Sequence, residues 1–162
     1  MRVLLVGGGG REHALALRIA ASPTLSALGV THDNPGWPDI AQRMTAADPV
    51  EAAQELRADL VVVGPEAPLE AGLADRLQEA GIPCFGPVAA AARLESSKAF
   101  AKEVMAAAGV PTADHLAVDT ADPDQLEAAR ARCAQGRVVV KADGLAAGKG
   151  VIVCRTGDEG LA

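Results

Sequence analysis

The basic, glycine-rich segment KADGLAAGKG at residues 141–150 has the composition to bind phosphate. Runs of β-branched residues flank it at 138–140 and 151–153, so we expect a β-hairpin with a long connection. The segment differs from a P-loop, because only three residues separate Gly144 from the next glycine and a strand takes the place of the following helix. A mobile hairpin without a ligand is the alternative to a loop that folds over a phosphate.

Two lysines occupy positions where their charge calls for a partner. Lys98 falls in the first turn of a helix capped by Ser96 or Ser97, where the helix dipole disfavours a cation by roughly 0.3–1 kcal/mol. Lys141 ends an apolar strand, and either Asp143 or a phosphate would serve as its partner. For Lys98, a solvated surface lysine is the alternative.

A second glycine loop, GGGG at residues 7–10, follows the first apolar run of the chain. The dinucleotide fingerprint G-x-G-x-x-G/A fails there, because Glu12 or His13 stands where a small residue is required. The loop can still offer backbone N–H groups and a helix N-terminus to a phosphate, and Arg11 can add a charged donor. A tight turn without a ligand is the alternative.

Strand and helix signals alternate through residues 1–95. Apolar runs predict strands at 3–6, 28–31, 59–64 and 82–87. Periodic or capped segments predict helices at 11–22, 49–57 and 69–81. This alternation is typical of a parallel sheet with helices on both faces, so we predict an α/β, Rossmann-like doubly wound domain. Ligands bind where the carboxyl ends of such strands meet, so we expect a site formed by the loops at 7–12, 32–37, 64–69 and 85–87.

The pattern changes after residue 95, which indicates a separate unit. We expect a helix over 96–111, a strand at 112–118, a helix over 122–136 and then the hairpin.

Composition excludes several classes of protein. A net charge of −6 and 2% aromatic residues argue against nucleic-acid binding. No apolar run approaches the ~18 residues of a membrane span, and no cleavage site follows the first strand. Three scattered cysteines and three scattered histidines argue against disulfides or a zinc site. We therefore predict a cytoplasmic protein that binds neither nucleic acid nor membranes.

Several segments together resemble the phosphoribosylamine–glycine ligases, also called glycinamide ribonucleotide synthetases, a family of ATP-grasp enzymes in purine biosynthesis. They are GGGGREHALA, VVVGPEAPLEAGLAD, FGP…AARLESSKAFAKEVM, GVPTA and VVVKADGLAAGKGVIV. The resemblance implies that ATP converts the carboxylate of glycine to an acyl phosphate, and that the amine of 5-phosphoribosylamine displaces the phosphate. It also implies a substrate domain at 1–95, a connecting helix and the start of the ATP-grasp region at 96–112, and part of a lid subdomain at 113–162. A monomer is expected.

The resemblance also assigns site residues. Those expected at ATP are Lys98, Lys141, Asp143, Gly144, Leu145, Ala146, Ala147, Gly148, Lys149 and Gly150. Those expected at the phosphoribosyl substrate are Gly8, Gly9, Gly10, Arg11, Asn34, Gly36, Gly64, Pro65 and Glu66. Because few cations lie near Glu66 in the sequence, we expect it to contact the amine or hydroxyl groups of the substrate and not a neighbouring side chain. No residue is assigned a catalytic or metal-binding role.

The sequence departs from the family in two respects. The second loop reads HDNPG where the family usually has Pro-Gly-Asn-x-Gly, so only Asn34 and Gly36 match. Family members are also considerably longer, so the chain resembles an amino-terminal fragment that is inactive alone. Ligands for Mg²⁺ (or Mn²⁺) are expected beyond residue 162. The alternatives are the cofactor domain of an NAD-dependent oxidoreductase, which the broken fingerprint disfavours, and a non-catalytic nucleotide-binding module.

Overall fold

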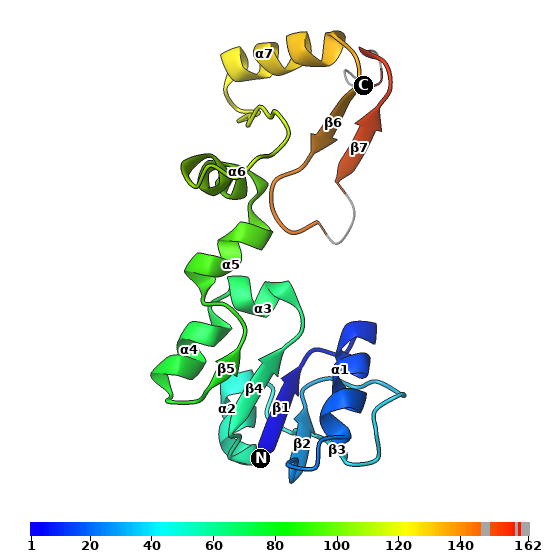
Figure 1. Ribbon diagram of the computed structural model, residues 1–162, viewed down its shortest axis with the longest axis vertical. Coiled ribbons are helices and arrows are strands. Elements are labelled where there is room, and N and C mark those ends of the chain that lie inside the picture. Colours follow the sequence, from blue (N-terminus) through cyan, green and yellow to red (C-terminus); the bar gives the residue numbers. More distant parts are fainter. Residues whose placement is uncertain (147–149, 158, 160–162) are drawn as a thin grey trace. The chain divides into compact units, whose positions relative to one another are not determined.

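The computed structural model describes residues 1–146, 150–157 and 159 (Figure 1). The chain divides into two compact units, Met1–Arg93 and Leu94–Ala162. None of the helices in the described ranges has the length and apolar character that crossing a membrane requires.

A five-stranded parallel sheet forms the centre of the first unit, in the spatial order β3-β2-β1-β4-β5. In chain order the strands are β1 (Arg2–Val6), β2 (Ala27–Val30), β3 (Ala41–Arg43), β4 (Leu60–Val63) and β5 (Cys84–Phe85). The chain builds outward from β1 and then returns to add β4 on the other side of β1. This order confirms the predicted doubly wound fold and puts its switch point between β1 and β4, where such sheets bind ligands.

Helices cover both faces of this sheet (Figure 1). Alternate residues of β1 enter two separate cores, because neighbouring side chains of a strand point to opposite faces. Leu4 packs in a core with Ala52, whereas Leu5 packs in a core with Ala16. The second core contains α1 (Gly10–Ala20), and the first contains α2 (Pro49–Leu56), α3 (Glu66–Glu70) and α4 (Leu73–Glu79).

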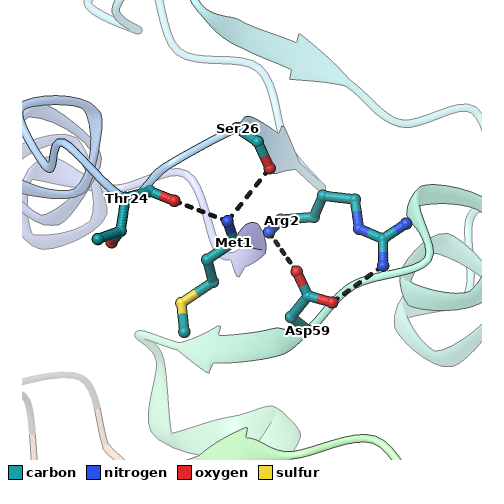
Figure 2. Close-up of polar contacts among 5 residues, drawn as sticks. All are labelled: Met1, Arg2, Thr24, Ser26 and Asp59. Carbon is teal, nitrogen blue, oxygen red and sulfur yellow. Dashed lines mark hydrogen bonds and ion pairs between the residues drawn. The ribbon is translucent and has the colours of Figure 1, made fainter.

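Polar contacts fix the beginning of β1 (Figure 2). The backbone N–H of Arg2 donates to Asp59 Oδ2 at 2.7 Å, and its Nη2 donates to Asp59 Oδ1 at 2.9 Å. The amino group of Met1 donates to the carbonyl of Thr24 at 2.6 Å and to Ser26 Oγ at 3.2 Å. The side-chain hydrogen bond from Arg2 lowers the pKa of Asp59 to about 2. These contacts lie at the amino ends of the strands, away from the edge where a ligand is expected.

Four features of the fold differ from the sequence predictions. The single helix expected over 69–81 is two helices, because Gly72 adopts a left-handed conformation (φ 83°) between α3 and α4. The strand expected at 112–118 is wrong: this segment has no regular structure, and no strand of the described residues pairs with it. The sequence also did not predict β3 or α5 (Ala89–Ser96).

The described part of the second unit includes helices α6 (Lys98–Ala107) and α7 (Pro123–Ala134) and the predicted hairpin. Ser97 caps α6 by accepting a hydrogen bond from the N–H of Phe100 at 3.1 Å. The hairpin pairs β6 (Val138–Lys141) with β7 (Val151–Cys154) in antiparallel register, with Lys141 opposite Val151. The register places the glycine-rich segment in the connection between the two strands.

Candidate functional site

The loops after β1 and β2 meet at the carboxyl edge of the sheet. Asn34 Nδ2 donates to the carbonyl of Gly8 at 2.9 Å, while its Oδ1 accepts from the N–H of Gly36 at 2.8 Å. A β-carbon on Gly8 would lie 2.7 Å from His32 Cβ, and one on Gly36 would lie 2.7 Å from His13 Nε2. The two glycines therefore permit a close approach of the loops, and Asn34 holds the loops together with both polar atoms of its amide.

A salt bridge joins the loop after β1 to the loop after β4. Arg11 Nη1 donates to Glu66 Oε1 at 2.8 Å and to the carbonyl of Gly64 at 2.7 Å. This side-chain hydrogen bond holds the pKa of Glu66 below its ordinary value. The prediction that no nearby cation explains Glu66 is therefore wrong, because the parallel sheet brings together loops that are far apart in the sequence.

A shallow hollow of about 280 Å³ lies between these two loops, lined by Gly9, Gly10, Arg11, Glu12, Pro65 and Glu66. Two of the loop N–H groups already have acceptors. That of Gly7 donates to Thr31 Oγ1 at 3.2 Å, and that of Gly9 donates to Glu12 Oε2 at 2.7 Å. The N–H groups of Gly8 and Gly10 have no acceptor among the described residues. They are the backbone donors that remain for an anion.

In the second unit, Asp143 binds the hairpin loop to the start of α6. Its Oδ1 accepts from the N–H of Lys98 at 2.5 Å and from that of Ala99 at 3.4 Å, and its Oδ2 accepts from Ser97 Oγ at 3.0 Å. Desolvation raises the pKa of Asp143, but these hydrogen bonds outweigh it and the pKa lies below its ordinary value. Asp143 thus occupies the helix N-terminus, a position that suits an anion.

Lys98 and Lys141, the two lysines whose charge calls for a partner, differ in their surroundings. Lys98 is half-buried, and its Nζ donates to the carbonyl of Gly144 at 2.9 Å. Lys141 is exposed at the end of β6, and no ion pair joins it to Asp143 within the described ranges. Of the two partners expected for Lys141, Asp143 therefore binds the start of α6 instead.

Glycines shape the described part of the hairpin loop. Gly144 and Gly150 both have positive φ angles, 95° and 75°. The N–H of Ala142 donates to the carbonyl of Gly150 at 2.8 Å and closes the loop at its base. Leu145 is exposed and Ala146 half-buried. The remaining predicted residues of this loop, Ala147, Gly148 and Lys149, lie outside the described residues.

The described residues do not provide a magnesium site. Mg²⁺ prefers a near-octahedral set of oxygen ligands, often with one or two carboxylates. Among residues 1–146, 150–157 and 159, no group of three or more histidine, cysteine or acidic side chains could hold a metal ion.

Sequence reasoning missed the roles of two carboxylates. Glu12 entered only as the residue that breaks the dinucleotide fingerprint, but it is 5% exposed and binds the glycine loop. A glutamate at the third position of a helix is a capping signal, so its bond to Gly9 was accessible from the sequence, whereas its burial was not. No sequence signal links Asp143 to a helix that begins 45 residues earlier.

Comparison with protein families finds two consecutive matches along the chain. The model described as "Phosphoribosylglycinamide synthetase, N domain" matches residues 1–95. The model described as "Phosphoribosylglycinamide synthetase, ATP-grasp (A) domain" matches residues 96–162.

Curated proteins called phosphoribosylamine–glycine ligase are similar over nearly the whole chain. The protein from Phenylobacterium zucineum is 50% identical over 96% of this chain and 37% of its own length. That from Streptomyces coelicolor is 51% identical over 94% of this chain and 37% of its own length. The chain thus spans little more than a third of the length of these relatives.

Solved structures with the same fold are more distant in sequence. The biotin carboxylase domain of 2-oxoglutarate carboxylase from Hydrogenobacter thermophilus has a TM-score of 0.71 and 23% identity, covering 99% of this chain and 38% of that one. D-alanyl-alanine synthetase A from Vibrio cholerae has a TM-score of 0.71 and 19% identity, covering 99% of this chain and 53% of that one. At these identities the likeness shows the fold alone.

Proposed function

Because the chain belongs to the phosphoribosylglycinamide synthetase family, we propose that it is the amino-terminal part of an enzyme that joins glycine to 5-phosphoribosylamine with ATP. The products would be glycinamide ribonucleotide, ADP and phosphate. The observation that carries this proposal is the half-identical match to phosphoribosylamine–glycine ligases across nearly the whole chain. Since the chain spans about 37% of those relatives, we assign the activity to the longer protein.

We assign residues 1–95 to the phosphoribosyl substrate. The free N–H groups of Gly8 and Gly10 would donate to its phosphate, as backbone donors near a helix N-terminus do elsewhere. Arg11 would add positive charge, and Glu66 would face the amine or hydroxyl groups. Asn34 would act through the position of the Gly8 carbonyl, because its own polar atoms are already bonded. In the same loops, Gly9, Gly36, Gly64 and Pro65 would supply shape and not charge.

We assign residues 113–162 to part of a lid over the ATP phosphates, and residues 96–112 to the connection that supplies Lys98. Phosphoryl transfer depends mainly on positioning and on stabilisation of negative charge. Lys98 and Lys141 would provide that charge, and the loop from Asp143 to Gly150 would exclude water from the acyl phosphate. When ATP arrives, its phosphates would compete with the Asp143 carboxylate for the N–H groups at the start of α6.

The proposed reaction has two balanced steps. In the first, a carboxylate oxygen of glycine attacks the γ-phosphorus and ADP leaves. In the second, the amine of phosphoribosylamine attacks the acyl carbon, loses a proton and expels phosphate. Mg²⁺ or Mn²⁺ would be bound by residues beyond 162, because the described residues do not fit such an ion. A monomeric state and a cytoplasmic location remain predictions.

The test is a ligation assay with labelled glycine. A full-length protein carrying this sequence should convert ATP, glycine and phosphoribosylamine to glycinamide ribonucleotide, with Mg²⁺ present. The 162-residue chain alone should release no phosphate above background. Absence of product from the folded full-length protein would refute the proposal, and turnover by the short chain would refute the assignment of the metal ligands beyond residue 162.

A further inference from the structure

Glu12 is an acidic side chain buried beside the proposed phosphoribosyl site, with an exposure of only 5%. Glutamate is almost never buried to this extent without a partner. Its Oε2 accepts from the N–H of Gly9 at 2.7 Å, which ties the start of α1 to the loop before it. The proposed reaction gives Glu12 no role, so its burial requires another explanation.

Three glycines surround the Glu12 side chain. A β-carbon on Gly64 would lie 2.1 Å from Glu12 Oε1, one on Gly7 would lie 2.8 Å from Cγ, and one on Gly9 would lie 2.9 Å from Oε2. Real β-carbons do not approach other atoms so closely. By contrast, nothing lies within 4 Å of a β-carbon on Gly10. A side chain at position 9 or 64 would therefore have to displace Glu12, and one at position 7 would also meet Pro65.

Helix capping alone does not account for this arrangement. Glu51 occupies the same third position in α2 as Glu12 does in α1, and it is exposed. An exposed glutamate at this position is enough to favour a helix N-terminus. What distinguishes Glu12 is its contact with Gly64, which belongs to the loop after β4. The neighbouring Arg11 also reaches this loop, through the carbonyl of Gly64 and through Glu66.

We propose that Glu12 is a positioning residue that sets the shape of the anion site between the loops after β1 and β4. Its side chain fills the space between Gly7, Gly9 and Gly64 and takes the N–H of Gly9. The ligand is then left with the N–H groups of Gly8 and Gly10, in a hollow whose width Glu12 fixes. The inference rests on the proposed function only for the identity of the anion, a sugar monophosphate.

Binding measurements on the full-length protein test this role. Ribose 5-phosphate is the probe for the first unit and ADP the probe for the second. Glu12→Ala should weaken the binding of ribose 5-phosphate by about tenfold, which is the usual effect of losing a charged hydrogen-bond acceptor. Glu12→Gln should restore most of the affinity, because its amide oxygen can still accept from Gly9. ADP affinity should not change in either variant, and the matched control Glu51→Ala should bind both probes as the parent does.

A double-mutant cycle tests the packing independently of any ligand. Gly64→Ala should lower the melting temperature strongly, because its β-carbon meets the Glu12 carboxylate. In a protein that already carries Glu12→Ala, Gly64→Ala should lower the melting temperature much less, since the space that the Glu12 side chain occupied is then free. If Glu12→Ala does not fold, the cycle is run with Glu12→Gln, in which Gly64→Ala should remain as costly as in the parent.

The outcomes separate this inference from the proposed function. Additive effects of Gly64→Ala and Glu12→Ala on the melting temperature, or unchanged ribose 5-phosphate binding by a folded Glu12→Ala protein, would overturn the role of Glu12. Either result would leave ligation intact. Failure of the ligation assay, with the binding loss and the coupling still observed, would overturn only the proposed reaction.

Discussion

The glycine loop after β1 and the hairpin loop after β6 both use a carboxylate to bind backbone N–H groups at the start of a helix, but only the first carboxylate is buried. Glu12 is 5% exposed and enclosed by glycines, whereas Asp143 is exposed and bonds to Ser97, Lys98 and Ala99. Water can replace the contacts of an exposed carboxylate at little cost, whereas it cannot readily enter a packed interior.

This difference suggests two kinds of ligand site. The conformation of the loop after β1 is fixed before a ligand arrives, because the Glu12 carboxylate that holds it is packed between two loops of one sheet. Under the proposed function the hairpin loop would exchange the Asp143 carboxylate for a phosphate, since both groups are anions and both are favoured at a helix N-terminus. A preformed site suits the recognition of a substrate, and an exchangeable contact suits a lid.

The largest effect should follow from a change in the preformed loop. Gly9→Val should raise the KM for phosphoribosylamine by about tenfold or more and leave the KM for ATP nearly unchanged, because the added carbons displace the Glu12 carboxylate at a typical cost of ~1–3 kcal/mol. Steady-state kinetics of the full-length enzyme measure both values. The control is Ala14→Val, which adds carbons to an exposed position of the same helix α1. A rise in the KM for ATP alone would indicate that the nucleotide, and not phosphoribosylamine, binds at this loop.

In the second unit, the main effect should come from Lys98. Lys98→Ala should weaken ADP binding by about tenfold, because the proposed charge-assisted contact of the Lys98 ammonium group to a phosphate would be lost. Lys102 lies on the same helix, where its Nζ donates to Thr112 Oγ1 at 2.6 Å and to the carbonyl of Ala113 at 2.8 Å. Lys102→Ala should therefore bind ADP normally. Equal losses of ADP affinity in calorimetric titrations of the two variants would contradict the assignment of Lys98 to the nucleotide site.

Amide hydrogen exchange should distinguish the N–H groups bound by Glu12 from those bound by Asp143. The N–H of Gly9 should exchange more slowly than that of Lys98, and Asp143→Asn should accelerate exchange at Lys98 by roughly fivefold, since a lost cap costs ~1 kcal/mol. The pKa of Asp143 lies below its ordinary value. Protection of the Lys98 N–H should therefore persist above the pKa that Asp143 has in the unfolded chain. It should be lost as the pH falls through the lower pKa that Asp143 has in the folded protein. Slower exchange at Lys98 than at Gly9 would contradict the comparison.

The smallest effect concerns an exposed carboxylate at the opposite edge of the first sheet. The side-chain hydrogen bond from Arg2 lowers the pKa of Asp59 from its ordinary value of 3.8 to about 2. Asp59 therefore stabilises the fold above pH 3.8, and this contribution should disappear as the pH falls through about 2. Urea midpoints of the parent and of Asp59→Asn should differ slightly at neutral pH and converge in acid. A constant difference across this range would remove the ion pair as its cause.

Local patterns in the sequence were enough to predict most of the regular elements. The apolar runs at 3–6, 59–64 and 138–140 form strands, and the capped segments that begin near Pro49, Lys98 and Pro123 form helices. Alternation of these elements predicted the doubly wound sheet. Such features depend on residues close in sequence, whose spacing already determines which side chains share a face.

The errors lie where distant segments decide the outcome. Residues 112–118 have the apolar character of a strand, but a strand requires a partner for its backbone groups. The helix expected over 69–81 is interrupted at Gly72, where the chain turns from α3 to α4 against the same core. In both places the local signal was real and the tertiary surroundings changed its result.

The sequence by itself determined the family, most of the strands and helices, and which loops gather at the carboxyl edge of the first sheet. Only the tertiary structure decided how the charged groups at that edge and in the hairpin are paired. Arg11 meets Glu66 across 55 residues, Glu12 is buried against Gly64, and Asp143 binds α6 and not Lys141. The physical reason is that pairing depends on distance and burial in three dimensions, which the spacing of residues along a chain does not contain.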